Sequence, residues 1–247
     1  MSNDSQDPKP EVHPLSGAFD VLAVFSLAVL PDLLHSFMAT NFISTNSSDA
    51  GSSSVNSFLI LLIVRSLQVS LPILLVLKLR NVRWSDYGFV KFRPLLDPLV
   101  AIGIAVLGYV TYYLYAYGLL FAGVDFSGDA NAIGGMTQNA QLGIGTIALV
   151  VLSSCANGFA EEIAMRSYLL VRIGELCGSI VVAAVLTTIL FAAYHSYQGR
   201  YGIVSALAIG AVFATYFVVT KRFWPVAIAH ALMDIVGLAA LLTQSAG

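Results

Sequence analysis

Charged residues are scarce in this chain of 247 residues: they make up 11% of it, whereas an average soluble domain carries about 25%. Hydrophobic residues make up 57%, and the mean hydropathy is +0.82. Twelve Lys and Arg with a net charge of −2 cannot form the phosphate-binding stripe of a nucleic-acid-binding protein. The composition also excludes a water-soluble enzyme and a disordered chain. It indicates a multi-pass integral membrane protein in contact with lipids.

Other common features are absent as well. Cys155 and Cys177 are the only cysteines, and we expect small buried thiols rather than a disulfide. No CxxC pair or HExxH sequence is present. Residues 1–16 lack the basic region and cleavage site of a signal peptide, so we expect a flexible tail there. No internal repeat is evident, although many transporter folds are built from repeats.

Long apolar segments fill most of the remaining chain. Because a spanning helix needs about 20 apolar residues, they predict an all-α fold, a polytopic transmembrane helix bundle with about seven or eight spanning helices. The spans are predicted at 17–38, 58–79, 98–122, 142–175, 179–197, 202–220 and 223–243. The count becomes eight if Pro31 splits the first segment. The Ser-rich residues 44–57 and residues 123–141 are predicted loops.

The basic residues orient this bundle. Seven alternating spans place ten of them on one side, namely Lys9, Lys78, Arg80, Arg83, Lys91, Arg93, Arg166, Arg172, Lys221 and Arg222. Only Arg200 falls on the other side, and Arg65 lies within a span. By the positive-inside rule, the N-terminus and the basic loops are predicted to be cytoplasmic.

Ionisable residues inside the spans are costly, so each is a functional hypothesis. The ten are Asp20, Asp32, His35, Arg65, Glu161, Glu162, Arg166, His195, His230 and Asp234. Six of them lie in the last 90 residues and form three groups. These groups are Glu161-Glu162…Arg166, Phe191…His195 and His230…Asp234.

The first and third groups have helical spacing. Glu162 and Arg166 are four residues apart and share one helix face, so Arg166 can neutralise Glu162. Glu161 points elsewhere and has no local partner; a carboxylate in that situation suits a general base or acid. His230 and Asp234 also share a face, which lets the carboxylate orient the imidazole. Alone, each group could also be structural, and an isolated histidine such as His195 is more often a core residue.

Taken together, two imidazoles, an unpaired carboxylate and an Arg-paired carboxylate are what activation of a bound water requires. Glu161 and His195 each lie 17 residues from Gly178, the predicted turn, and so at the same depth. His230 lies only eight residues after Arg222, or about 12 Å along a helix. Convergence therefore requires tilted helices or a turn at 196–201 that dips into a protein-lined cavity.

At these residues the chain resembles the CPBP family of intramembrane proteases, also called the CAAX prenyl endopeptidase type or ABI family. That family is marked by EExxxR, FxxxH and HxxxN/D in this order on successive membrane helices. The WPVAIAHALMD context and the WSDYGF segment at 84–89 are also similar to the family. The resemblance covers residues 142–243. It divides the chain into a tail at 1–16, N-terminal helices at 17–141 with a basic cytoplasmic loop at 79–96, and a catalytic core at 142–243.

The resemblance implies an intramembrane endopeptidase that hydrolyses a peptide bond by glutamate-activated water. It implies Glu161 as the general base and His195 as the group that holds the water. Glu162, Arg166 and Phe191 would support them, and His230 with Asp234 would stabilise the oxyanion. Asp234 stands where the family often has Asn, which leaves its role as donor or acceptor open.

Two questions stay open at this point. The family has been described as metalloprotease-like, and Glu161, His195 and His230 could hold zinc; we favour a site without a cofactor. The substrate would be a membrane-associated protein or peptide: a prenylated CAAX protein, a bacteriocin-like or signalling peptide, or a sorting-tail protein. The alternatives are a non-catalytic immunity or scaffold protein on the same fold and, less favoured, a proton-coupled transporter.

Overall fold

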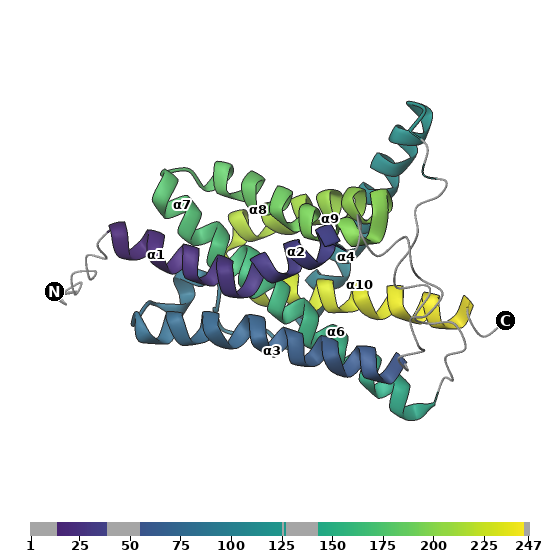
Figure 1. Ribbon diagram of the computed structural model, residues 1–247, viewed down its shortest axis with the longest axis horizontal. Helices are drawn as coiled ribbons and strands as arrows, with labels where there is room; N and C mark the ends of the chain where they lie inside the picture. Colours follow the sequence, from purple (N-terminus) through teal and green to yellow (C-terminus); the bar gives the residue numbers. More distant parts are fainter. Residues whose placement is uncertain (1–13, 39–54, 125, 127–142, 245–247) are drawn as a thin grey trace.

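Every regular element in the computed structural model is a helix. The structure describes residues 14–38, 55–124, 126 and 143–244, and no strand occurs among them. The all-α class is therefore confirmed. Most helices run along the long axis of the molecule, with α1 beginning at one end and α10 finishing at the other (Figure 1). In chain order the elements are α1 (Pro14–Val24), η1 (Phe25–Val29), α2 (Leu30–Met38), α3 (Val55–Leu79), η3 (Trp84–Tyr87), α4 (Leu96–Phe121), α6 (Ile144–Glu162), η4 (Ile163–Leu170), α7 (Val171–Cys177), α8 (Ile180–Tyr194), η5 (Ser196–Gln198), α9 (Gly199–Thr220) and α10 (Phe223–Gln244).

Six helices in the described part of the chain are long and apolar enough to cross a membrane, and the bundle is polytopic as expected. The count of seven or eight is not confirmed, because α8 has only 15 residues. It rises over about 22 Å, whereas the hydrocarbon core is about 30 Å thick. The chain then turns within the bundle through η5 into α9.

The first span stays continuous despite Pro31. Residues Gly17–Ser36 form one apolar span rather than two helices. The π-helical segment η1 ends at Val29, two residues before the proline. Because proline cannot donate a backbone hydrogen bond to the preceding turn, a locally widened helix is a way to accommodate it without a break.

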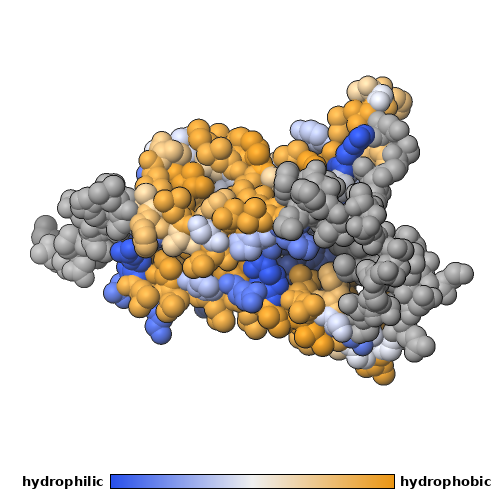
Figure 2. Space-filling view, in the orientation of Figure 1, coloured by the Kyte–Doolittle hydropathy of each residue, from blue (hydrophilic) through white to orange (hydrophobic). Residues whose placement is uncertain are grey.

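The outer surface of the bundle is apolar. Leucines such as Leu22, Leu71 and Leu114 are exposed, and Figure 2 shows hydrophobic residues over most of the visible face. An exposed apolar surface of this extent fits contact with lipid acyl chains. Cys155 and Cys177 are exposed too, so the expectation of buried thiols is wrong. In a membrane an apolar segment does not have to be buried inside the protein, which is why the prediction failed.

The start of α10 is fixed against the segment between α3 and α4. The Trp224 Nε1–H donates to the Val90 carbonyl oxygen at 3.0 Å, and the Phe223 N–H donates to the Gly88 carbonyl oxygen at 2.9 Å. Arg222 Nη2 contacts both carboxylate oxygens of Asp97, at 2.7 and 2.9 Å. Gly88 has φ of +84°, and a Cβ there would lie 2.6 Å from the Phe217 ring. These contacts set the depth at which α10 enters the bundle.

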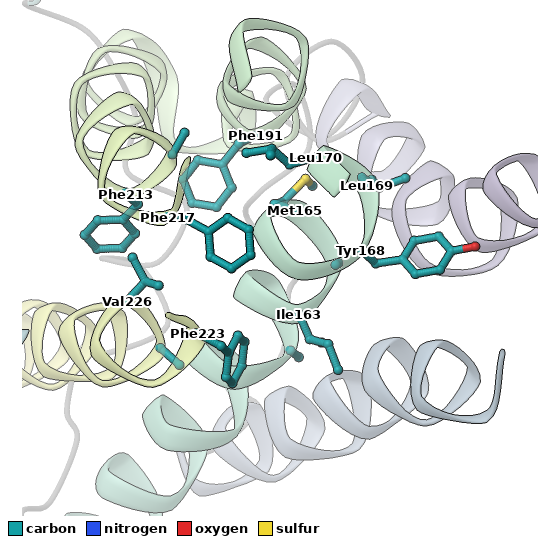
Figure 3. Packing of buried hydrophobic residues seen from close by; sticks show 14 of the residues in the cluster. Ile163, Met165, Tyr168, Leu169, Leu170, Phe191, Phe213, Phe217, Phe223 and Val226 are labelled. Carbon is teal, nitrogen blue, oxygen red and sulfur yellow. The ribbon is translucent and has the colours of Figure 1, made fainter. Parts of the chain in front are cut away.

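A cluster of large side chains surrounds the middle of the helix that runs from α6 through η4 to α7. Figure 3 shows Phe213, Phe217 and Phe223 gathering with residues of η4 such as Met165. All eight residues of η4 are buried. Arg166 and Arg172 are buried as well, so they do not mark a cytoplasmic loop as the charge count assumed.

Several predictions fall on other residues. The tail predicted at 1–16, the loop at 44–57 and the loop at 123–141 lie largely outside the described residues. Where the tail was predicted to end, α1 already begins at Pro14.

Candidate active site

A cavity of about 900 Å³ lies within the bundle and is lined by residues of α2, α3, α4, α6, α8, α9 and α10. Seven of the ten in-span ionisable residues line it: Asp32, His35, Arg65, Glu161, His195, His230 and Asp234. Figure 2 shows hydrophilic surface along the seam between α2 and α3, on a face that is otherwise largely hydrophobic. The sequence predicted three groups, and the fold brings residues of all three to one cavity.

Behind the cavity wall, Glu162 and Arg166 form the predicted ion pair. Arg166 Nη1 lies 3.0 Å from Glu162 Oε1, and the two side chains are 1% and 0% exposed. Arg166 also donates to the Gly210 carbonyl oxygen at 3.3 Å and lies over the Phe191 ring at 4.3 Å. The guanidinium thus has an anion, a carbonyl and an aromatic face as partners, which offsets the cost of burying its charge.

His230 connects the two glutamates. Its Nδ1 lies 2.7 Å from Glu162 Oε1, and its Nε2 lies 3.3 Å from Glu161 Oε2. Asp234 Oδ1, the partner expected from sequence spacing, lies further away at 3.7 Å from Nε2. Both ring nitrogens therefore face carboxylates. The two contacts can be hydrogen bonds together only if the ring carries both protons or one carboxyl group is protonated.

Asp234 has a closer partner than His230. The Asn157 Nδ2 amide donates to Asp234 Oδ2 at 2.9 Å, and both residues line the cavity. Asn157 precedes Glu161 by four residues on α6, so the two side chains share a helix face. The amide therefore holds Asp234 on the same wall as Glu161.

His195 directly follows α8 as its C-cap residue, and one of its ring nitrogens bonds to the helix. Its Nδ1 lies 2.7 Å from the Phe191 carbonyl oxygen. A carbonyl oxygen only accepts, so Nδ1 carries the hydrogen and Nε2 of the neutral ring is an acceptor. The Phe191 ring packs against both histidines, with centroid distances of 4.6 Å to His195 and 5.9 Å to His230. Phe191 thus contacts both imidazoles.

The cavity wall depends on a close approach of α6 and α10. A Cβ on Gly158 would lie 2.8 Å from the Ala231 nitrogen and 3.0 Å from the Ala227 carbonyl oxygen. Both neighbours are backbone atoms and cannot move independently of the helix. The absence of a side chain at Gly158 therefore permits Glu161 and His230 to meet.

Substituting Gly158→Ala should push α6 away from α10 and separate Glu161 from His230. We expect a destabilisation of about 1–3 kcal/mol, typical of overpacking, with loss of any activity that depends on this contact. The midpoint of thermal unfolding in detergent measures the first effect. Gly145→Ala is the matched control, because a Cβ at Gly145 on the same helix meets nothing within 4 Å. Equal effects of the two substitutions would contradict the prediction.

The site residues do not form a ready metal centre. Among the residues that the structure describes, no group of three or more His, Cys, Asp or Glu is arranged to hold a metal ion. In the set considered from sequence, Glu161, His195 and His230, both nitrogens of His230 face carboxylates. That set does not fit a metal without rearrangement of His230.

The part of the chain that carries the three motifs is similar to a known protein family. Residues 143–236 match the family model of the type II CAAX prenyl endopeptidase Rce1-like proteins. The match supports the assignment of this segment to the CPBP/CAAX protease family. The Rce1-like segment contains all three motifs and every expected site residue, and at the family level it is that of a CAAX-protease-like intramembrane endopeptidase. No curated protein and no solved structure matched the chain.

Some residues that line the cavity were not singled out from the sequence. Asn157 could have been found from its position four residues before Glu161. Asp32 and Arg65 were noted separately, but their ion pair between α2 and α3 was not predicted. A pair of residues from different spans can be predicted only when the arrangement of the helices is known. The spacing of residues along one helix does not reveal which helices are neighbours.

Proposed function

We propose that this chain is an intramembrane endopeptidase that cleaves a membrane-associated protein or peptide by glutamate-activated water. The observation that carries the proposal is the meeting of Glu161, His195 and His230 at one cavity within the Rce1-like segment. The family's description favours a prenylated protein or peptide with a CAAX sequence as substrate. The surrounding apolar bundle fits a substrate that arrives through the membrane.

In the proposed reaction, the Glu161 carboxylate takes a proton from a water molecule whose other hydrogen is accepted by His195 Nε2. The resulting hydroxide adds to the carbonyl carbon of the scissile bond. Glu161 then returns the proton to the leaving nitrogen as the carbon–nitrogen bond breaks, so that a carboxylic acid and an amine are formed. No proton has to come from bulk water during the cycle.

The remaining residues support this base. Glu162, which is paired with Arg166, contacts Nδ1 of His230 and fixes the orientation of the imidazole. His230 in turn orients the carboxylate of Glu161. Once Glu161 is protonated, its attraction for His230 Nε2 weakens. The imidazole, with Asp234 beside it, can then turn to the oxyanion. His230 would therefore contact Glu161 before water is activated and the oxyanion afterwards, so both roles can belong to the same imidazole.

The test is cleavage by the purified protein in detergent or liposomes of a farnesylated peptide that ends in a CAAX sequence, followed by mass spectrometry. We expect defined cleavage products, and the same rate after addition of a chelator. Absence of cleavage of this peptide and of its unprenylated form would contradict the proposal. Loss of activity with the chelator, restored by zinc, would show that the site holds a metal.

We also propose that the basic loops face the cytoplasm. The exposed basic residues near the helix ends carry this orientation. With Cys155→Ser as background, a cysteine introduced at Ser52 should react with a membrane-impermeant maleimide in intact cells. Cys177, at the end of α7, should react only after permeabilisation. The reverse labelling pattern would overturn the orientation.

A further inference from the structure

One end of the bundle carries a basic segment, residues 78–93, which runs from the end of α3 toward α4. Its exposed basic residues are Lys78, Arg80, Arg83, Lys91 and Arg93. The junction of α9 and α10 lies at the same end, because Arg222 Nη2 donates to the Lys91 carbonyl oxygen at 3.2 Å. Four long helices therefore meet this basic end: α3 and α9 finish there, and α4 and α10 begin there.

The catalytic cavity occupies the opposite half of the bundle. Its lining residues on α3 fall at 58–65 and those on α9 at 201–209, in the first half of each helix. Those on α4 fall at 109–112 and most of those on α10 at 234–241, in the second half of each helix. Figure 1 shows that α3 begins and α10 finishes on the same side of the molecule. All four helices thus place the cavity away from the basic end.

Several lining residues in this half are exposed. Leu61 is 65% exposed and Tyr201 is 41% exposed, and both line the cavity. Gly237 lies about two turns beyond His230 on α10 and is exposed as well. A Cβ at Gly237 would meet no atom within 4 Å. The cavity wall therefore continues into the surface of the bundle in the half opposite the basic segment.

The half toward the basic end is filled by side chains instead. Phe213, Phe217 and Phe223 are fully buried there and pack together in Figure 3. A pocket beside Tyr168 and Arg172 in this half has a volume of about 10 Å³, room for about one water molecule. No proposed catalytic residue lines that pocket. A peptide could approach the catalytic residues from the basic end only by displacing this aromatic core.

We propose that the substrate is a membrane-associated polypeptide whose scissile bond reaches Glu161 from the half of the membrane opposite the basic segment. This inference rests on the proposed peptidase function, and it adds the face of the membrane at which cleavage takes place. Water for the hydrolysis enters by the same route. With the basic segment in the cytoplasm, the cleavage site lies at the outer surface. That position favours a signalling peptide or a sorting tail over a prenylated tail at the cytoplasmic surface.

Thiol labelling tests the route without depending on activity. In a background with Cys155→Ser and Cys177→Ser, Gly237→Cys places a thiol in the cavity. Ser85→Cys is the matched control, because Ser85 is exposed in the basic segment. A membrane-impermeant maleimide is applied to right-side-out and to inside-out membrane vesicles. We expect each variant to be labelled in one type of vesicle only, and the two variants in opposite types. Labelling of Gly237→Cys from the same side as Ser85→Cys, or from neither side, would overturn the proposal.

A second measurement follows cleavage in the same two types of vesicle, which carry the wild-type protein. The farnesylated CAAX peptide is added outside, and each type is also assayed after solubilisation in detergent. We expect cleavage only in the type in which Ser85→Cys is shielded from the maleimide, and cleavage by both types in detergent. Cleavage with the basic segment outside would overturn the proposed route, while the peptidase function would stand. If the solubilised protein cleaves no peptide, the peptidase function fails and the substrate proposal with it, whereas the labelling still shows which face the cavity serves.

Discussion

Replacing Glu161 with Gln should reduce peptide cleavage by about 10²–10⁴-fold, the usual contribution of a general base. Gln has nearly the same size and can still accept a hydrogen bond, but it cannot take a proton from water. Glu161 lines the cavity and is not paired with Arg166, whose contact is with Glu162. Its removal should therefore leave the bundle intact. The measurement is kcat for the farnesylated CAAX peptide, together with the thermal unfolding midpoint.

Glu175→Gln serves as the control for Glu161→Gln. Glu175 lies on α7 of the same long helix, but its side chain is 51% exposed and pairs with Arg172. We expect the Glu175 variant to cleave as wild type does. Wild-type activity in Glu161→Gln would show that Glu161 is not the base. Loss of activity in both variants would indicate a change in the helix rather than in the chemistry.

Replacing Arg166 with Met should be the most destabilising single change among the site residues. It leaves Glu162, which is 0% exposed, without its cation, and an uncompensated buried charge costs about 3–5 kcal/mol. The contacts of the guanidinium with Gly210 and Phe191 are lost as well. The expected result is a much lower unfolding midpoint in detergent, with loss of cleavage because His230 is no longer held.

Two further variants test the physical reason for the Arg166 effect. The double substitution Glu162→Gln with Arg166→Met removes both charges and should recover much of the lost stability, although not the activity. Arg83→Met removes one partner of an exposed pair, whose side chains are 65% and 44% exposed, and should change stability by at most about 1 kcal/mol. An equally low midpoint for the double variant and for Arg166→Met alone would contradict the buried-charge explanation.

Contacts within one helix were predictable from the sequence. The pair of Glu162 and Arg166 follows from a spacing of four residues, and the structure contains it. The same rule was less successful for His230 and Asp234, which are 3.7 Å apart while each has a closer partner on α6. Helical spacing brings two side chains to the same face, but the neighbouring helix decides which partner each one contacts.

Contacts between helices could not be read from the sequence. His230 and Glu162 are separated by 68 positions along the chain. Their meeting depends on the depth of α10, which is fixed by Asp97 and Arg222, and on the close approach of helices at Gly158. Tyr197 and Gln198, in the turn after α8, line the cavity. A turn that reaches the cavity is one of the two arrangements by which the three motifs could converge.

The amino-acid sequence alone specifies a helical membrane protein in which three polar motifs interrupt the apolar spans. Burying a charge in a membrane is costly, so each ionisable residue inside an apolar span indicates a functional or structural role. The tertiary structure was needed to show that Glu161, His195 and His230 share one cavity and that both glutamates face His230. Those relations depend on helix depth and helix–helix distance, which are set by packing at a few small or charged residues.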